Sequence, residues 1–384
     1  MVVVEFVFWI SVFILYYIYD GYLRLLILMD HLFSSAESNV GNRDKLPTVT
    51  VLVTVFNEER SIVQKIDNIR ACDYPPELLQ IIIASDGSID NTDDLVRNLP
   101  YDNLLLFRPE NRVGKTDTQN QAMEKVSSEI VIFSDADTYF DKHFLLNITA
   151  PFRDDQVGGV DGHLLFTIDP QSAVSQSQGF YWDYELKIRE RESRLGLLAV
   201  TSGACLAIRR KLFLKMEAEY GEDCIIPLDI VAQGYKIIHA SEALAYDQME
   251  YAPQKEFANR VRMTIRNLQG TFSRKHLLNP VTFLKFSFSL WSHKILRWFS
   301  PVFLLLVTAS AFLLSMSSFF YQIVLFGLIC FYGAAGIGKM TEMYQLQVPF
   351  VRTVYSFVLA NYGFFIGILR AFKNEKITTY RDDN

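Results

Sequence analysis

The sequence has few cysteines and few charges, and it lacks an excess of basic residues. Its four cysteines show no CxxC or metal-ligand spacing: Cys72, Cys205, Cys224 and Cys330. At 384 residues a disulfide framework is not expected, and reduced thiols fit a cytosolic main domain. Only 21% of the residues are charged and 14% are aromatic, which excludes a disordered chain. The net charge of −6 argues against a dedicated nucleic-acid binder.

Long apolar runs are present at both ends of the sequence. The first covers residues 2–19, where Glu5 is the one charge. Three more follow, at residues 299–320, 320–338 and 348–369. A run of about 20 apolar residues is long enough to cross a bilayer as a helix. We therefore expect an N-terminal transmembrane helix within 1–30 and further transmembrane helices within 299–372. A signal peptide is not indicated, because a basic n-region and a small-x-small cleavage site are both missing.

Residues 46–275, between these runs, are typical of a soluble α/β domain. Short runs rich in β-branched residues alternate with helical patterns. The expected strands are 48–56, 79–85, 103–108 and 129–135, and the expected helices include 61–70 and 115–126. Strands separated by helices of about 10–15 residues form a parallel sheet. The ligand crevice of such a sheet lies at the carboxyl ends of its strands.

The segment that joins this domain to the later apolar runs is mixed in character. Residues 276–298 combine aromatic and basic side chains, which predicts an amphipathic interfacial helix with Trp291 and Trp298 at headgroup depth. An ordinary amphipathic helix on the soluble domain is the alternative. Residues 34–45 form a short polar linker between the first apolar run and the domain.

The charges next to the apolar runs predict an orientation but leave one conflict. Arg24 and Lys45 follow the first run, which favours a cytosolic domain. Three further spans would place the C-terminus outside, although Arg370 and Lys373 there favour the inside. Either a re-entrant pair around residues 361–363 or one helix lying in the interface would remove the conflict.

Acidic residues follow three of the expected strands. Glu58 follows the first strand, Asp86 the second, and Asp135 and Asp137 the fourth. Two carboxylates at i and i+2 after a buried strand can bind one hard cation, and Mg²⁺ or Mn²⁺ prefers such oxygen ligands together with phosphate oxygens. Asp86 lies in a Ser-Asp-Gly-Ser turn, where it either serves the turn itself or accepts hydrogen bonds from a nucleobase or ribose.

Two further motifs each allow a structural and a functional interpretation. Residues 112–116 (RVGKT) resemble the end of a phosphate-binding P-loop, but Pro109 stands where the first glycine should be, so a P-loop NTPase is excluded. Lys115 can still neutralise a phosphate at the start of a helix. Glu222 and Asp223 precede a helical stretch, where they either complement the helix dipole or supply a general base.

In their order and spacing, these motifs resemble the family 2 glycosyltransferases, inverting enzymes of the GT-A fold. The membrane-bound branch includes cellulose, chitin, hyaluronan and poly-N-acetylglucosamine synthases and exopolysaccharide transferases. The resemblance runs from about residue 46 to the C-terminus. It rests on VTVLVTVFNEE (49–59), ASDGSIDNT (84–92), RVGKTDTQNQA (112–122), FSDADTYF (133–140), TSGACLAIRR (201–210), GED (221–223) and RVRMTIRNLQG (260–270). It implies a Rossmann-like α/β domain with a mostly parallel sheet between N- and C-terminal transmembrane helices.

The resemblance also implies a role for each motif residue. The nucleotide would be bound by Thr54, Phe56, Glu58, Asp86, Lys115, Asp135, Arg262 and Arg266. The acceptor would lie against Ser202, Gly203 and Ala204. Asp135 and Asp137 would bind Mn²⁺ or Mg²⁺, with Asp137 the more direct ligand. Asp223 would be the general base that deprotonates the acceptor hydroxyl, and Glu222 would support it.

The implied reaction is an inverting, metal-dependent sugar transfer from a nucleotide sugar, expected to be a UDP-sugar. The acceptor would be lipid-linked or a surface glycan, at the cytosolic face of the plasma membrane. The implied partners are the donor, the acceptor, the bilayer and other membrane proteins of glycan assembly, with no nucleic acid. Asn259 and Met263 stand where processive members have the Gln and Trp of Q-x-x-R-W, so single-sugar transfer is favoured over a processive synthase.

Other classes stay open at this point. A transporter or scaffold would explain the apolar runs but not the ordered acidic motifs. A Mg²⁺-dependent nucleotidyltransferase would have a Gly-rich basic loop after its first strand, where this sequence has VFNEER. An inactive membrane protein that binds a nucleotide sugar would show binding without turnover.

Overall fold

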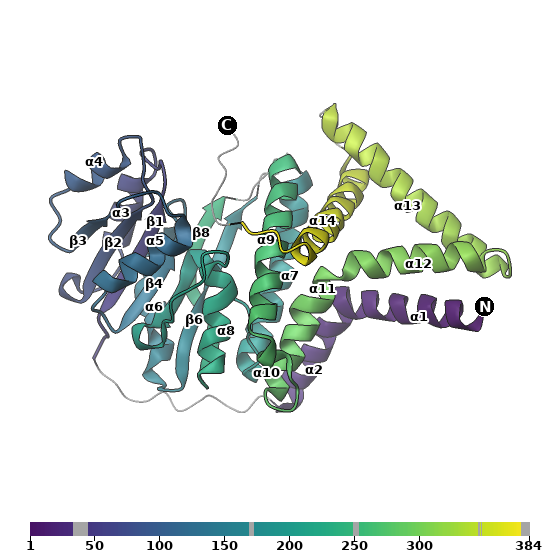
Figure 1. Cartoon of the computed structure of the whole chain (residues 1–384), viewed down its shortest axis with the longest axis horizontal. Helices are drawn as coiled ribbons and strands as arrows, with labels where there is room; N and C mark the ends of the chain where they lie inside the picture. Colours follow the sequence, from purple (N-terminus) through teal and green to yellow (C-terminus); the bar gives the residue numbers. More distant parts are fainter. Residues whose placement is uncertain (34–44, 169–172, 249–252, 345, 347, 378–384) are drawn as a thin grey trace.

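The computed structural model describes residues 1–33, 45–168, 173–248, 253–344, 346 and 348–377. The polar linker predicted at 34–45 lies almost wholly outside the described residues. A domain built on one mixed sheet carries a group of apolar helices on one side (Figure 1). We call residues 46–275 the sheet domain.

Eight strands form the sheet in the order β3-β2-β1-β4-β7-β6-β8-β5. Their bounds are β1 Val49–Val55, β2 Leu79–Ser85, β3 Leu104–Phe107, β4 Ile130–Ser134, β5 Tyr139–Phe140, β6 Val157–Thr167, β7 Leu206–Arg209 and β8 Lys236–Gln248. The first four strands were predicted, and β1 pairs in parallel with both β2 and β4. This part of the sheet is the parallel half that the sequence indicates.

The second half of the sheet is mixed, so the sheet is mostly but not wholly parallel. Strand β7 runs antiparallel to both β4 and β6, and β5 runs antiparallel to β8, whereas β6 and β8 are parallel. The sequence did not indicate β6, VGGVDGHLLFT, because glycines and a buried aspartate interrupt its apolar residues. Such a strand shows neither a continuous apolar run nor a clean alternation.

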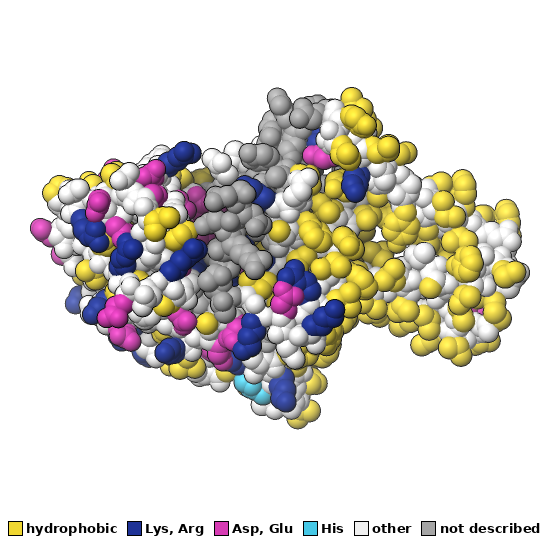
Figure 2. All heavy atoms as spheres, turned by 45° about the horizontal axis from the view of Figure 1, so that its top comes forward, with side chains coloured by type: hydrophobic (Ala, Val, Ile, Leu, Met, Phe, Trp, Pro, Cys, Tyr) yellow, Lys and Arg dark blue, Asp and Glu magenta, His cyan; other side chains and the backbone are white. Residues whose placement is uncertain are grey.

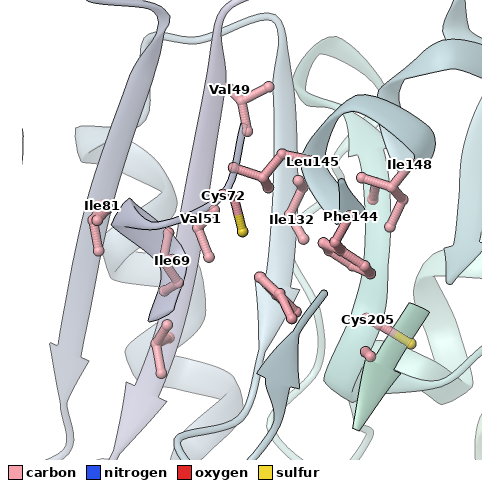
Figure 3. Packing of buried hydrophobic residues seen from close by; sticks show 14 of the residues in the cluster. Val49, Val51, Ile69, Cys72, Ile81, Ile132, Phe144, Leu145, Ile148 and Cys205 are labelled. Atoms are coloured by element: carbon pink, nitrogen blue, oxygen red, sulfur yellow. The ribbon is translucent and has the colours of Figure 1, made fainter. Parts of the chain in front are cut away.

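Helices cover both faces of the sheet. Those of the sheet domain are α3 Ile62–Arg70, α4 Thr92–Arg97, α5 Lys115–Ala122, α6 Phe144–Thr149, α7 Ala173–Leu195, α8 Glu222–Ala232 and α9 Pro253–Ser273. Short 3₁₀ turns lie at Pro76–Leu78, Met123–Lys125, Ala150–Arg153, Gly203–Cys205, Arg210–Leu212 and Lys275–Leu278. Alternate residues of β1 enter the cores on opposite faces, with Val51 on one side and Leu52 on the other. Figure 3 shows Val51 packed among Ile69, Cys72 and Ile132. Burial on both faces explains why β1 is almost continuously apolar.

The remaining helices are apolar. They are α1 Val2–Tyr16, the π-helical turn Tyr17–Gly21, α2 Tyr22–Phe33, α10 Leu284–Ser289, the π-helical turn Leu290–Ile295, α11 Leu296–Trp298, α12 Ser300–Leu314, α13 Phe319–Met343 and α14 Pro349–Phe372. Three are long and apolar enough to cross a membrane: Val2–Phe33, α13 and α14. Leu284–Trp298 and α12 meet at an angle of 58°, and only the two together are long and apolar enough to cross a membrane. Hydrophobic side chains dominate the surface of this helical part (Figure 2).

The predicted interfacial segment begins in the 3₁₀ turn Lys275–Leu278, and its α-helical part starts only at Leu284. Trp291 is 43% exposed, whereas Trp298 is 6% exposed and packs in a cluster with Val261 of α9 and Ile368 of α14. The indole of Trp298 therefore fills the space between helices. Its depth relative to a bilayer stays a prediction.

Helix α14 runs unbroken past residues 361–363, so the re-entrant alternative is wrong. It lies along α9, and two glycines allow the close approach. A Cβ on Gly363 would lie 2.9 Å from Arg260 Cγ, and one on Gly367 would lie 2.5 Å from Thr264 Cβ. Beyond α14, Lys376 Nζ lies 2.5 Å from Glu219 Oε1 of the sheet domain. The chain after α14 therefore contacts the sheet domain.

Candidate active site

The predicted site residues lie together in two adjoining pockets, of about 260 and 230 Å³, beside the carboxyl ends of β1, β2 and β4. The first pocket is lined by Thr54, Val55, Phe56, Glu58, Asp86, Arg112, Lys115, Asp135, Ala136 and Asp137. Predicted residues that line the second pocket are Lys115, Asp135, Ser202, Gly203, Ala204, Glu222, Asp223, Arg262 and Arg266. Lys115 and Asp135 belong to both pockets and connect them.

Asp86 fixes the loop that carries Lys115. Its Oδ1 accepts hydrogen bonds from the backbone N–H groups of Val113 and Gly114, both at 2.9 Å, and from Thr118 Oγ1 at 3.0 Å. Gly114 has φ +90°, a left-handed conformation that suits glycine, and α5 begins directly after it. Asp86 is therefore both a wall of the first pocket and the anchor of the helix start that faces it.

A stacked pair and an unpaired hydroxyl complete the first pocket. The guanidinium of Arg112 lies 3.6 Å from the centroid of the Phe56 ring and 3.7 Å, at Nε, from Asp86 Oδ2. Thr54 Oγ1 is buried and has no hydrogen-bond partner among the described residues. An aromatic face, a cation and an unsatisfied hydroxyl are groups that can bind a planar heterocycle.

Lys115 joins the carboxylates of the two pockets. Its Nζ lies 2.7 Å from Asp135 Oδ1 and 2.7 Å from Glu222 Oε1. Burial alone would raise the pKa of Glu222, but the charge and hydrogen bond of Lys115, a backbone N–H and the charge of Arg266 together hold that pKa below its ordinary value. Glu222 is therefore a fixed anion that orients Lys115.

Three carboxylates converge where the pockets meet. Desolvation and the charge of Asp135 raise the pKa of Asp137. Burial and the charge of Asp137 raise the pKa of Asp247, in β8, to about 7. Among the described residues, no group of three or more His, Cys, Asp or Glu side chains is arranged to hold a metal unaided. The donor set fits a hard divalent cation that takes its further ligands from a substrate diphosphate, because an added cation would relieve this repulsion.

A buried lysine supports the loop that carries these carboxylates. Lys65 of α3 is fully buried, and its Nζ donates to Ser134 Oγ at 2.8 Å and to the Thr138 carbonyl. Its Nζ also lies 3.9 Å from the Phe140 ring centroid. Burial lowers the pKa of Lys65 to about 7. This side chain holds both ends of the segment that contains Asp135 and Asp137.

Asp223 lies at the N-terminus of α8, in the second pocket. Burial and the charge of Glu222 raise its pKa. A Cβ on Gly221 would lie 2.6 Å from Asp223 Oδ1, so the glycine leaves room for this carboxylate. A raised pKa gives a carboxylate more strength as a base at neutral pH.

The segment Ser202–Ala204 lies directly against Glu222. A Cβ on Gly203 would lie 2.7 Å from Glu222 Oε1. The Ser202 N–H donates to Asp161 Oδ1 at 2.7 Å, and Asp161 is fully buried in β6. Arg189 Nη1 lies 3.2 Å from Asp161 Oδ2. A buried ion pair therefore fixes the floor of the second pocket.

Helix α9 closes the second pocket. Arg266 Nη2 donates to Thr116 Oγ1 at 3.2 Å, and Thr116 Oγ1 donates to the Tyr220 carbonyl at 2.6 Å. Arg262 and Met263, one turn earlier, line the same pocket. Both arginines face the point where Lys115 and Asp135 meet, which makes this side of the site cationic.

Comparisons with known proteins identify the family of the domain in which these residues lie. Residues 50–216 match the model of the family described as Glycosyl transferase family 2. This chain contains a family 2 glycosyltransferase domain. The matched segment runs from β1 to just after β7, and it includes every lining residue of the first pocket and Ser202–Ala204 of the second.

This chain matches only part of the length of its relatives, about a third of the first and less than two thirds of the second. A 125-residue segment is 34% identical to the poly-beta-1,6-N-acetyl-D-glucosamine synthase of Staphylococcus aureus (strain COL), and it spans 32% of this chain and 30% of that relative. A longer segment of 261 residues is 25% identical to an N-acetylglucosaminyltransferase of Rhizobium meliloti (strain 1021). It covers 63% of this chain and 61% of the relative.

A solved structure shows that the fold extends beyond the matched segment. The mannosyltransferase PcManGT from Pyrobaculum calidifontis, in complex with GDP-Man and Mn²⁺, superposes with a TM-score of 0.71 at 20% identity. The superposition covers 96% of this chain and 100% of that structure. The GT-A fold with N- and C-terminal apolar helices, predicted from the sequence, is thereby confirmed.

Sequence analysis did not single out three residues that lie in or beside the two pockets. Arg112 lies in the RVGKT motif, so its neighbours gave a signal for it. Asp247 lies in β8, a strand that the sequence did not indicate. Lys65 occupies a helix whose charged residues normally face solvent, and nothing local shows that this position is buried.

Proposed function

We propose that the family 2 domain transfers a sugar from a nucleotide sugar to an acceptor hydroxyl, with inversion at the anomeric carbon. One observation carries this proposal: a nucleotide-sized pocket and a pocket that holds a buried carboxylate share Lys115 and Asp135. A donor whose diphosphate lies at the shared residues would present its sugar to Asp223. The GDP-Man and Mn²⁺ of the P. calidifontis structure support a nucleotide-sugar donor.

In the first pocket, the base would stack beside Phe56 and Arg112 and hydrogen-bond to Thr54. Glu58 and Asp86 line the same pocket. We propose a UDP-sugar as donor, on the resemblance described above. The diphosphate would be neutralised by Lys115, Arg262 and Arg266, because the negative charge that develops on the leaving group is stabilised by fixed cations.

Asp135 and Asp137 would hold Mn²⁺ or Mg²⁺, with Asp247 close to both. When bound, the metal supplies a positive charge against the leaving diphosphate. Asp223 would take the proton of the acceptor hydroxyl as the new bond to the anomeric carbon forms. The bond between that carbon and the phosphate oxygen breaks, and its electrons leave with the nucleoside diphosphate. Attack and departure on opposite faces invert the anomeric centre.

The acceptor would enter over Ser202, Gly203 and Ala204, and it would be lipid-linked or a surface glycan. Met263 lies in this pocket and is 49% exposed. Because it replaces the stacking Trp of the processive pattern, we propose addition of a single sugar. Partner membrane proteins of glycan assembly stay a prediction.

We further propose that the protein lies in the plasma membrane with the sheet domain in the cytosol. The first helix (Val2–Phe33), α12 together with the segment Leu284–Trp298 before it, and α13 would cross the bilayer, and α14 would lie beside the sheet domain. The contact of Lys376 with Glu219 supports this arrangement, because it keeps the chain after α14 on the side of the sheet domain. Three crossings satisfy that condition, and the basic residues after α14 then lie inside.

Release of nucleoside diphosphate by the purified protein in nanodiscs tests the proposed reaction. UDP-, GDP- and dTDP-sugars would be compared with Mn²⁺, Mg²⁺ and EDTA. We expect release from one donor, abolished by EDTA and by Asp137→Ala. Asp94→Ala removes an exposed aspartate of α4 and should have no effect. Absence of both release and nucleotide-sugar binding would contradict the proposal, and binding without release from any donor and acceptor would indicate an inactive binding protein.

A further inference from the structure

A cavity of about 270 Å³ lies outside the active site, between the sheet domain and the apolar helices. Its walls come from the first helix, α7, α9, α11 and α14. Aromatic side chains dominate the lining: Tyr19, Phe180, Tyr181, Tyr184, Phe357 and Phe364. A cavity with this lining suits a hydrocarbon chain better than a free sugar, which needs many hydrogen-bonding groups.

Two arginines and one carboxylate, Glu256, line this largely apolar cavity. Arg297 is 5% exposed, and its Nη1 donates to Glu185 Oε2 at 3.1 Å and to Tyr181 Oη at 3.3 Å. Arg260 is half-buried on α9 and pairs with Glu256. A guanidinium has five N–H donors, so each arginine can bind a second anion in addition to its carboxylate. Both guanidinium groups lie close to the Tyr181 ring, at 5.5 and 4.8 Å from its centroid, so the two cations lie in the same part of the cavity.

Two more polar groups in the cavity have no hydrogen-bond partner within the described part of the chain. Ser356 of α14 is 9% exposed, and its Oγ has no hydrogen-bond partner among the described residues. The same holds for Nε2 of Gln178 on α7, within the part of the chain that the structure describes. Buried polar atoms are normally paired, and unpaired ones that face a cavity indicate a ligand or ordered water.

We propose that this cavity binds the lipid end of the acceptor, with the hydrocarbon chain along the aromatic walls and a phosphate group at Arg260 and Arg297. This inference rests on the proposed function, since it names the acceptor of that reaction. The cavity is bounded by two helices that are apolar enough to lie in a membrane, Val2–Phe33 and α14. Because Val2–Phe33 would cross the bilayer in the proposed arrangement, the cavity would lie next to the membrane surface, within reach of a lipid phosphate.

The position of the cavity also decides which group accepts the sugar. Arg260 faces the cavity, whereas Arg262 and Arg266 of the same helix face the active site. The width of a helix, about 10–12 Å, therefore separates the bound phosphate from the reacting centre. A phosphate is already ionised at neutral pH and needs no base, whereas Asp223 is placed to deprotonate a hydroxyl. The acceptor is thus a sugar hydroxyl carried on a lipid phosphate, not the phosphate itself.

A chain of buried ion pairs connects the two sites. Glu185 accepts from Arg297 through Oε2 and from Arg189 Nε through Oε1, the latter at 3.2 Å. Arg189 pairs with Asp161, which holds the Ser202 N–H in the second pocket. The phosphate end of the cavity and the floor of the acceptor pocket are therefore parts of one rigid network.

Native mass spectrometry of the full chain in detergent tests this inference. The probes are farnesyl diphosphate, farnesol, inorganic pyrophosphate and a phosphatidic acid. We expect farnesyl diphosphate to bind about tenfold or more tightly than each of the other three, since charged hydrogen bonds and an apolar chain must act together. Equal binding of phosphatidic acid would show an ordinary bilayer-lipid site, and equal binding of pyrophosphate would show a free-phosphate site. Either result overturns the proposal.

Two variants and a matched control locate the binding. Ser356→Phe fills the cavity, and Arg260→Gln removes one cation; each should weaken farnesyl diphosphate about tenfold. Leu369→Phe adds the same ring on the exposed side of α14, where Leu369 is 45% exposed, and should bind as the wild type does. If one variant fails to fold, the other carries the comparison. Wild-type affinity in a folded variant overturns the proposal.

Measurements on the same purified protein distinguish a failure of the lipid site from a failure of the proposed function. Turnover of a nucleotide sugar without any preference for farnesyl diphosphate would support the proposed transferase and contradict the proposed lipid site. Lipid binding without any nucleotide-sugar binding would contradict the proposed transferase, and the lipid could then not be its acceptor.

Discussion

Asp223 and Glu222 are neighbours in the sequence, yet their environments push their pKa values in opposite directions. Lys115 keeps Glu222 anionic, whereas burial and the adjacent Glu222 charge make Asp223 the stronger base. The sequence could show that two carboxylates precede a helix, but not which one is paired. That distinction depends on Lys115, which is more than a hundred residues away in the chain.

We expect the pH profile of kcat/KM to show this base. A base must be deprotonated, so activity should fall as the pH drops through the raised pKa of Asp223, above the ordinary aspartate value of about 3.9. Glu222→Gln removes the repelling charge and should shift this acid limb to lower pH. Steady-state rates between about pH 4 and 8 measure the shift. An acid limb that stays in place in Glu222→Gln would contradict the assignment.

Lys65 leads to a prediction about stability. Its folded pKa of about 7 lies below the unfolded value of about 10.4, so between these values the unfolded chain binds the extra proton. Stability should therefore rise with pH across this window, by up to about 1.4 kcal/mol per pH unit. Lys65→Met abolishes this contribution, and thermal unfolding at several pH values measures the difference from the wild type. Lys142→Met, at an exposed position, is the control. Equal pH dependence in the wild type and in Lys65→Met would contradict the burial of this ammonium.

At the scale of elements, the parallel half of the sheet could be predicted and the other half could not. Strand β2 was expected at 79–85, where it lies, because its residues are continuously apolar. Strands β6 and β8 were missed because their polar residues serve the site: Asp161 holds the Ser202 loop, and Asp247 lies beside Asp137. Polar residues within these strands interrupt the apolar pattern by which a strand is predicted from sequence.

The packing of α14 on α9 depends on glycine. Gly367→Val would place atoms within 2.5 Å of Thr264, so the two helices must separate. We expect a loss of about 1–3 kcal/mol in stability, seen as a lower midpoint of thermal unfolding in nanodiscs. Gly336→Val on α13 is the matched control, because a Cβ there meets nothing within 4 Å. A neutral Gly367→Val would show that α14 does not pack closely on α9.

At the scale of the whole molecule, the contacts of α14 support the proposed arrangement with three membrane crossings. Apolar length alone makes α14 a candidate span, but its long contact with α9 and the ion pair of Lys376 with Glu219 place it beside the sheet domain. Hydropathy could not show this, since it measures how apolar a segment is and not what covers it.

Cysteine labelling in sealed vesicles tests this topology. Cys330→Ser first removes the exposed native thiol, while the other three cysteines are buried. Met316→Cys, in the turn between α12 and α13, should react from one side of the membrane with an impermeant maleimide. Lys373→Cys should react only from the other side, together with Lys142→Cys of the sheet domain. Labelling of Lys373→Cys from the side of Met316→Cys would contradict the arrangement.

The central claim is that one site has a half that binds the donor and a half that deprotonates the acceptor. Isothermal titration of the nucleotide sugar with Mn²⁺, combined with turnover on the same samples, tests it most directly. Asp223→Asn should keep the donor affinity of the wild type and lose about 10²–10⁴-fold in turnover, because only the base is removed. Asp137→Ala should lose metal-dependent donor binding itself. The claim would be contradicted if Asp223→Asn kept normal turnover, or if Asp137→Ala bound the donor as tightly as the wild type.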